Sequence, residues 1–121
     1  MKVIQIGTGG WGKNHCRVLS EFGVLSAICD MNFERAKEFG EKYNVSYYKT
    51  IEELFEKEDF DAAFICTPTS THSDLALELI KKRKHVFVEK PMTYLSEDGE
   101  NLVEEAKRNK VILTCGYIER F

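Results

Sequence analysis

The sequence predicts a three-layer α/β fold with a doubly wound parallel sheet, and two observations carry this prediction. Short apolar, strand-like runs alternate with amphipathic helical stretches along all 121 residues. The first run, Lys2 to Ile6, leads through a glycine-rich turn, Gly7 to Gly12, into the first helix. Right-handed crossovers and the position of this turn favour the strand order 3-2-1-4-5-6.

The first half of the chain contains three predicted strands, over residues 2–6, 25–29 and 46–48. Asn32 is placed to cap the second helix, and Thr50 opens a capping box for a short acidic helix. Helical periodicity predicts an apolar face for each of the first two helices. These faces hold His15, Val18, Leu19 and Phe22 in the first helix, and Phe33, Ala36, Gly40 and Tyr43 in the second.

The second half continues the alternation with strands over 61–66, 85–88 and 111–115 and a helix over 96–109. The strand over 61–66 is apolar on both faces, as a central strand covered by helices should be. A helix that begins near Ser70 follows it, with an apolar face of His72, Leu75, Ala76, Leu79 and Ile80. The ligand crevice is therefore expected at the carboxyl ends of the first and fourth strands.

Composition favours a small molecule as the partner of a single domain. The net charge of −3, from 17 basic and 20 acidic residues, argues against a nucleic-acid surface. The basic run over 81–84 complements a helix C-terminus. No basic stripe suits a membrane, and the apolar runs are too short to span one. The four cysteines form no CxxC pair, so we expect reduced thiols in the cytoplasm and no metal site.

The glycine turn has the spacing of a phosphate-binding loop. Gly7 lets the chain leave the strand sharply, Gly9 leaves room for a pyrophosphate, and Gly12 lets the helix pack closely on the sheet. The N–H groups at the start of the helix then face the anion. The other members of the predicted loop are Thr8, Gly10 and Trp11, the last through its backbone N–H.

A carboxylate closes the second strand. Asp30 follows Gly12 at about the 20-residue offset of an acid that accepts hydrogen bonds from a ribose diol. Because no arginine directly follows Asp30, the carboxylate is expected to repel a 2′-phosphate and to favour NAD over NADP. The spacing therefore predicts a Rossmann-type dinucleotide site.

The loop after the fourth strand is the second part of the predicted site. Thr67, Pro68 and Thr69 follow the strand end, where a cofactor would cross the sheet. His72 lies in the first helical turn beyond them, and from there it is placed to donate to a cofactor phosphate or ribose. An alternative is that His72 only occupies the start of its helix.

Lys90 follows the fifth strand, between Glu89 and Pro91. An ammonium at this place can lower the pKa of a nearby hydroxyl and hold it for hydride transfer. On physical grounds alone, an ordinary surface lysine is the favoured interpretation. His15 and His85 are expected to be structural, because they lie on a helix face and at the start of a strand.

Taken together, these motifs resemble the N-terminal half of the glucose-fructose oxidoreductase/inositol dehydrogenase (Gfo/Idh/MocA) family. The resemblance rests on the turn with Trp11, on residues 66–72, on 89–91 and on the closing segment 116–121. It implies an NAD(P)-dependent oxidoreductase that converts a ring hydroxyl of a sugar or cyclitol to a ketone. It also implies that Lys90 touches both the nicotinamide ribose and the substrate, and that a His and an Asp from a second domain complete the site. The form of the turn is similar to members that act on nucleotide sugars, although Tyr117 replaces their usual His.

We therefore expect residues 1–121 to form the NAD-binding domain of a sugar, cyclitol or nucleotide-sugar dehydrogenase, with Glu89 and Lys90 among its cofactor contacts. The C-terminal substrate domain lies outside this chain, which alone should bind cofactor without turnover. Two alternatives are a non-catalytic NAD(H)-sensing module and a methyltransferase that uses S-adenosylmethionine. A homo-oligomer is expected, because the last strand leaves an unpaired edge beside Tyr117, Ile118 and Phe121.

Overall fold

The computed structural model describes residues 1–10, 12–89 and 96–115. Its 6-stranded sheet has the order β3-β2-β1-β4-β5-β6, with every neighbouring pair parallel, which confirms the predicted topology. The strands are β1 (Val3–Ile6), β2 (Leu25–Cys29), β3 (Ser46–Tyr48), β4 (Ala62–Ile65), β5 (His85–Val88) and β6 (Leu113–Cys115). The helices are α1 (Gly12–Glu21), α2 (Phe33–Tyr43), α3 (Ile51–Lys57), the 3₁₀ turn η1 (Thr69–Thr71), α4 (His72–Lys81) and α5 (Ser96–Asn109).

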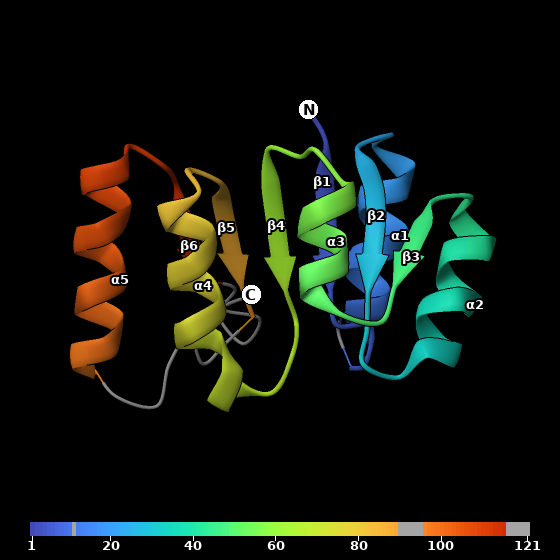
Figure 1. Ribbon diagram of the computed structural model, residues 1–121, viewed down its shortest axis with the longest axis horizontal. Helices are drawn as coiled ribbons and strands as arrows, with labels where there is room; N and C mark the ends of the chain where they lie inside the picture. Colours follow the sequence, from blue (N-terminus) through green and yellow to red (C-terminus); the bar gives the residue numbers. More distant parts are fainter. Residues whose placement is uncertain (11, 90–95, 116–121) are drawn as a thin grey trace.

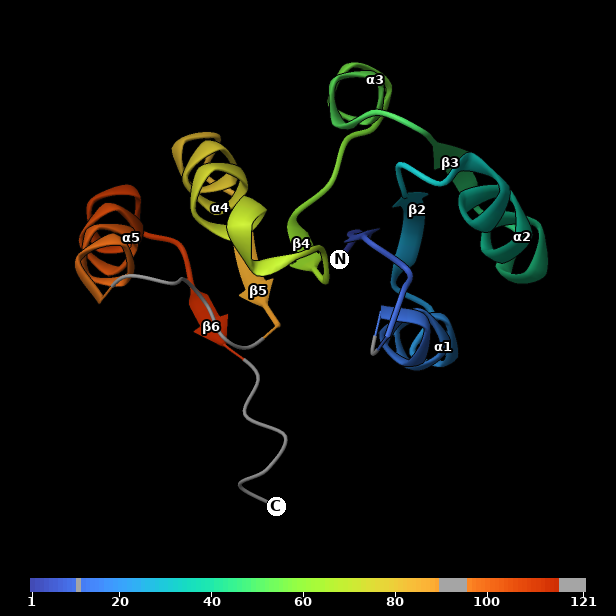
Figure 2. The same ribbon diagram turned by 90° about the horizontal axis from the view of Figure 1, so that it is seen from below.

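Helices cover both faces of the sheet (Figure 1). Figure 2 shows α1 and α2 on one side and α3, α4 and α5 on the other. The larger apolar core lies under α3, α4 and α5 and includes Ile4, Ile65 and Leu79, each fully buried. A smaller cluster around Val3 and Leu19 lies under α1. Because all strands run in one direction, their carboxyl ends share one edge, and the loops that leave this edge can build a site together.

Local sequence signals set several of these boundaries. Asn32 caps α2, since its side chain accepts a hydrogen bond from the backbone N–H of Arg35 at 3.3 Å. Thr50 caps α3 in the same way, with Glu53 N–H as the donor at 3.2 Å. The predicted apolar face of α4 is buried in full. No helix in the described ranges combines the length and the apolar character needed to cross a membrane.

The predicted apolar face of α1 is wrong in part. The residues that face the sheet are Gly12, Cys16 and Leu19, whereas Val18 is 36% exposed and Phe22 is 76% exposed. Spacings of four and three residues bring Gly12, Cys16 and Leu19 onto one stripe, and Val18 lies beside that stripe. Phe22 follows the end of α1, where Gly23 turns the chain with a φ of +73°. In α2 the interior positions Ala36 and Gly40 are buried as predicted, but Phe33 at its start is exposed.

Two thiols lie in the core. Cys16 is 0% exposed and Cys29 is 2% exposed, and burial raises the pKa of each from 9.0 to about 12. In the unfolded chain both thiols ionise near 9.0, whereas in the folded protein they stay neutral to much higher pH. The unfolded state therefore loses protons first as the pH rises, and it becomes more favourable relative to the folded state.

We expect the free energy of unfolding to fall as the pH rises above 9.0. Each of these two thiols contributes about 1.4 kcal/mol of lost stability per pH unit in that window. Urea unfolding at neutral pH and at a series of alkaline pH values measures the slope. In Cys29→Ala the slope should be shallower, whatever the stability at neutral pH. The same slope in Cys16→Ala, Cys29→Ala and the parent chain would contradict the assignment to these thiols.

Candidate functional site

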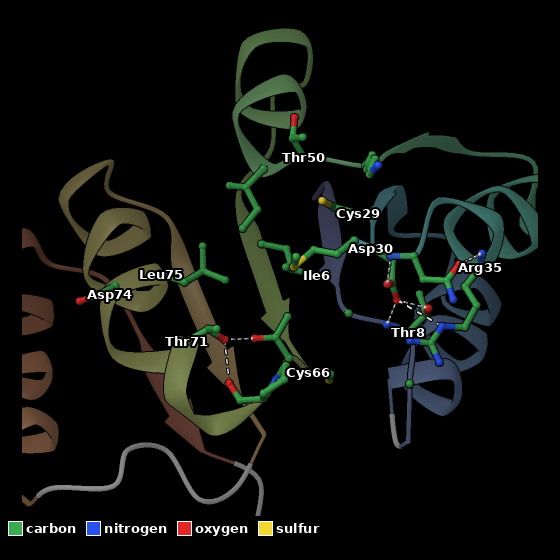
Figure 3. Close-up of a pocket in the computed structure, with 18 of the residues that line it drawn as sticks. Ile6, Thr8, Cys29, Asp30, Arg35, Thr50, Cys66, Thr71, Asp74 and Leu75 are labelled. Carbon is green, nitrogen blue, oxygen red and sulfur yellow. Dashed lines mark hydrogen bonds and ion pairs between the residues drawn. The ribbon is translucent and has the colours of Figure 1, made fainter.

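A pocket of about 1080 Å³ opens at the carboxyl edge of the sheet, among the ends of β1, β2 and β4 (Figure 3). This volume lies just above the range of about 300–1,000 Å³ that is typical of small-molecule sites. The pocket also lies where the strand order reverses direction between β1 and β4, which is where parallel sheets bind their ligands. The predicted site residues that line it are Gly7, Thr8, Gly9, Asp30, Thr67 and Pro68.

The glycine turn forms one wall of the pocket. At Gly7 the φ is +93°, and a Cβ there would lie 2.6 Å from the carbonyl oxygen of Cys66. At Gly12 a Cβ would lie 2.4 Å from the carbonyl oxygen of Gly7. Two steric requirements thus fix glycine at both ends of the turn, and α1 begins at the second of these glycines, Gly12. Backbone N–H groups at such a position bind anions.

Asp30 forms the second wall and is held in a defined orientation. The backbone N–H of Thr8 donates to its Oδ2 at 2.9 Å, and the Thr8 hydroxyl donates to the same oxygen. The backbone N–H of Asn32 donates to Oδ1 at 2.8 Å, and the residue is only 8% exposed. These three donors fix the orientation of the carboxylate. The structure therefore joins the end of β2 to the glycine turn through Thr8.

Arg35 is a pocket residue that the sequence motifs did not indicate. Its Nε lies 3.7 Å from Oδ2 of Asp30, and its guanidinium lies beside Gly9 (Figure 3). The side chain is 47% exposed, and Lys49 also lines the pocket. The predicted preference for NAD considered only the residue that directly follows Asp30. It did not consider the first turn of α2, which starts at Phe33 and brings Arg35 beside Asp30 and the glycine turn. A basic residue in the first turn of the helix after Asp30 was the sequence signal that could have indicated this contact.

The loop after β4 is fixed by its own hydrogen bonds. The Thr71 hydroxyl donates to the carbonyl of Pro68 at 2.7 Å and lies 2.6 Å from the Thr67 hydroxyl. His72 is 1% exposed, lies outside the set of pocket-lining residues, and donates from Nε2 to the carbonyl of Thr67 at 2.7 Å. The geometry thus gives His72 a contact that shapes the loop. The side chain of Thr69 lies outside the described part of the structure.

Cys66 lines the pocket between the glycine turn and this loop. Burial raises the pKa of its thiol to about 11, against the opposing effect of a hydrogen bond with Gln5. The thiol is therefore neutral at physiological pH and adds no negative charge beside an anionic ligand. Gln5 itself is fully buried, and its Nε2 donates to the carbonyl of Gly7 at 2.8 Å, which braces the turn from below.

The other predicted site residues lie away from the pocket lining or outside the described ranges. Gly10 is exposed, with a φ of +54° and open space around it. Glu89 lies at the end of β5, where its side chain contacts His15. Trp11 and Lys90, and with Lys90 the predicted catalytic role, fall outside the described residues.

The arrangement suits a dinucleotide. A glycine turn and a helix N-terminus offer N–H donors for a pyrophosphate, and an oriented carboxylate at the end of the next strand offers acceptors for a ribose diol. The pocket then extends across the sheet to the end of β4, where Thr67 and Pro68 lie. The sheet order and these two groups occur together in the fold that binds nicotinamide dinucleotides.

Known proteins agree with this interpretation. The model of the oxidoreductase family with an NAD-binding Rossmann fold matches residues 1–117. The chain is 38% identical to myo-inositol 2-dehydrogenase of Thermotoga maritima, over 100% of this chain and 37% of the relative. It is 30% identical to UDP-N-acetylglucosamine 3-dehydrogenase of Acidithiobacillus ferrooxidans, over 99% of this chain and 38% of that protein. The crystal structure of a probable dehydrogenase from Thermotoga maritima superimposes with a TM-score of 0.91 at 38% identity, again over 100% of this chain and 37% of the other.

The chain thus spans a little over a third of the length of these relatives. Its match to the family model runs through the glycine turn, the acid at the end of β2 and all six strands of the sheet. A methyltransferase that uses S-adenosylmethionine is no longer a competing interpretation. The chain belongs to the Gfo/Idh/MocA family of oxidoreductases, and it corresponds to the NAD-binding Rossmann domain of that family.

Proposed function

We propose that this chain is the cofactor-binding part of a dehydrogenase that moves a hydride between NAD and a ring hydroxyl of a sugar, cyclitol or nucleotide sugar. The observation that carries the proposal is the junction of Asp30 with Thr8, which sets a ribose-binding carboxylate against the pyrophosphate-binding turn. The substrate class rests on the relatives, whose names are those of a myo-inositol and a UDP-N-acetylglucosamine dehydrogenase.

The residues present fit the cofactor. The turn from Gly7 to Gly12 would hold the pyrophosphate, and Asp30 would accept from the ribose of the adenosine half. The nicotinamide half would extend toward the ends of β4 and β5, past Thr67 and Glu89. When bound, NAD supplies the hydride acceptor, and the chain orients it while the apolar walls of the pocket exclude water.

For the reaction itself we propose Lys90 as the catalytic residue of this chain. The support is its place in the sequence directly after Glu89, whose backbone N–H donates to the carbonyl of Ile65 at 2.9 Å and so holds Glu89 beside the end of β4. An ammonium there would lower the pKa of the substrate hydroxyl and hold it near the nicotinamide. A His and an Asp of a second domain would accept the proton, and this chain alone would bind NAD without turnover.

For the whole protein we further propose a cytoplasmic homo-oligomer. Cys16, Cys29 and Cys66 are separate thiols, which suits a reducing compartment. β6 lies at one edge of the sheet, and Ile112 just before it is 66% exposed. Association through this edge would cover both. Tyr117, Ile118 and Phe121, which are predicted to lie on the same surface, fall outside the described residues.

Calorimetric titration of the chain with NADH, NADPH and S-adenosylmethionine tests the cofactor assignment. We expect NADH to bind more tightly than NADPH, and S-adenosylmethionine not to bind. In parallel, cyclitols and UDP-sugars are added to the chain with NAD, and the absorbance of NADH is followed. No reduction of NAD is expected. Failure to bind NADH would contradict the proposed function, and substrate-dependent reduction of NAD would show that the chain carries a complete site.

A further inference from the structure

His15 and Glu89 form a polar pair at the carboxyl end of β5, away from the pocket lining. Nε2 of His15, in the first turn of α1, donates to Oε2 of Glu89 at 2.8 Å. The two side chains are 21% and 14% exposed. The pair is therefore largely shielded from solvent, and it joins the helix of the phosphate-binding turn to the strand that leads to residue 90.

The surroundings of the pair are apolar and well packed. The His15 ring lies edge-on to Phe64 and Phe87, with ring centroids 5.5 and 5.3 Å apart, and the two phenyl rings stack on each other at 4.6 Å. Sγ of Cys66 lies within 4.8 Å of a ring nitrogen of His15 and of a carboxylate oxygen of Glu89. The imidazole thus has one orientation, set by aromatic contacts on β4 and β5, and the neutral Cys66 thiol is the third polar group beside the carboxylate.

A shielded pair of this kind adds little to the free energy of unfolding. Removing a carboxylate and an imidazole from water costs free energy that their mutual attraction recovers only in part, and apolar residues of similar size would often stabilise a fold as well or better. A shielded pair that links two elements does fix their relative position, because its geometry is narrow. The elements it links here are the start of α1 and the end of β5.

We infer that His15 and Glu89 are positioning residues for the nicotinamide half of the cofactor. The inference rests on the proposed function. In a doubly wound sheet one half of the dinucleotide binds over β1 to β3 and the other over β4 to β6. Asp30 serves the first half, whereas the His15–Glu89 pair lies in the second. By tying the end of β5 to α1, the pair sets the distance between the pyrophosphate-binding turn and the carboxyl end of β5.

The test compares NADH with ADP, which has the same adenosine and both phosphates but lacks the whole nicotinamide half, its ribose included. Both ligands are titrated into the parent chain, His15→Ala, His15→Gln and Glu89→Gln by calorimetry. Loss of one charge-assisted hydrogen bond should weaken NADH binding by about tenfold in His15→Ala, with ADP binding changed by less than about twofold. His15→Gln, whose amide can still donate to Glu89, should restore most of the NADH affinity.

A spectroscopic measurement and a matched control separate positioning from a purely structural role. The emission of bound NADH reports the surroundings of the nicotinamide, and it should differ from the parent in His15→Ala and Glu89→Gln but not in His15→Gln. The control is Glu21→Gln, which breaks the exposed pair of Arg17 and Glu21 on the same helix and should change neither affinity. Urea unfolding identifies any variant that does not fold. The affinities of the variants that do fold then decide whether the pair has a positioning role.

Equal weakening of both ligands in His15→Ala and Glu89→Gln, or no weakening of either, would overturn the inference while leaving the proposed function intact. If the parent chain bound neither NADH nor ADP, the proposed function would fail first, and the inference would fail with it.

Discussion

Asp30→Ser is expected to weaken NADH binding by about tenfold and to reverse the preference from NADH toward NADPH. The carboxylate is the predicted acceptor for the ribose hydroxyls, and its negative charge opposes a 2′-phosphate. Once it is removed, the guanidinium of Arg35, which lies 3.7 Å from Oδ2 in the parent, is left beside Gly9 without its anionic partner. Lys49 adds a second positive charge to the same pocket. Both groups would then attract a 2′-phosphate.

Titration of NADH and NADPH into Asp30→Ser measures both effects. Asp30→Asn is the matched control, since it keeps a side-chain acceptor and removes only the charge. Asp30→Ser combined with Arg35→Ala should lose NADH affinity without gaining NADPH affinity. Unchanged NADH binding in Asp30→Ser would show that the carboxylate does not contact the ribose. A gain for NADPH that survives Arg35→Ala would assign the 2′-phosphate contact to another group.

Gly7→Ala is expected to destabilise the fold by about 3 kcal/mol and to abolish NADH binding. The backbone of Gly7 has a φ of +93°, and a Cβ would lie 2.6 Å from the carbonyl oxygen of Cys66. Gly7 and Cys66 cannot move apart easily, because both are tied to neighbouring strands. The Cys66 N–H donates to the carbonyl of Ile6 at 2.8 Å, and the Gly7 N–H donates to the carbonyl of Cys29 at 2.8 Å. Relief of the clash would shift the turn that binds the pyrophosphate.

Gly23→Ala is the control for the backbone strain in Gly7→Ala. Gly23 has a φ of +73°, but no heavy atom lies within 4 Å of the position that a Cβ would take. The substitution should therefore cost about 1 kcal/mol and leave NADH binding unchanged. Urea unfolding and calorimetric titration of both variants provide the comparison. Equal destabilisation by the two substitutions would mean that the positive φ, rather than the contact with Cys66, accounts for the effect of Gly7→Ala.

Local sequence signals were sufficient to predict the fold and one half of the site. Alternating strands and helices, the glycine turn and right-handed crossovers led to the correct strand order, because each rests on local chemistry or on general chirality. The link between Asp30 and the turn was also predictable. The two lie at the ends of adjacent parallel strands, so the topology brings them together whatever the surrounding side chains are.

The other side chains of the site are set by tertiary packing. The contact of Arg35 with Asp30, the support of Gly7 by Gln5 and the pairing of His15 with Glu89 each depend on how far one element is rotated or shifted against another. Periodicity gives such a rotation to within about one residue position, which is why Val18 was wrongly assigned to the buried face of α1. A side-chain contact needs a finer alignment than that, and the close packing of the helices on the sheet supplies it.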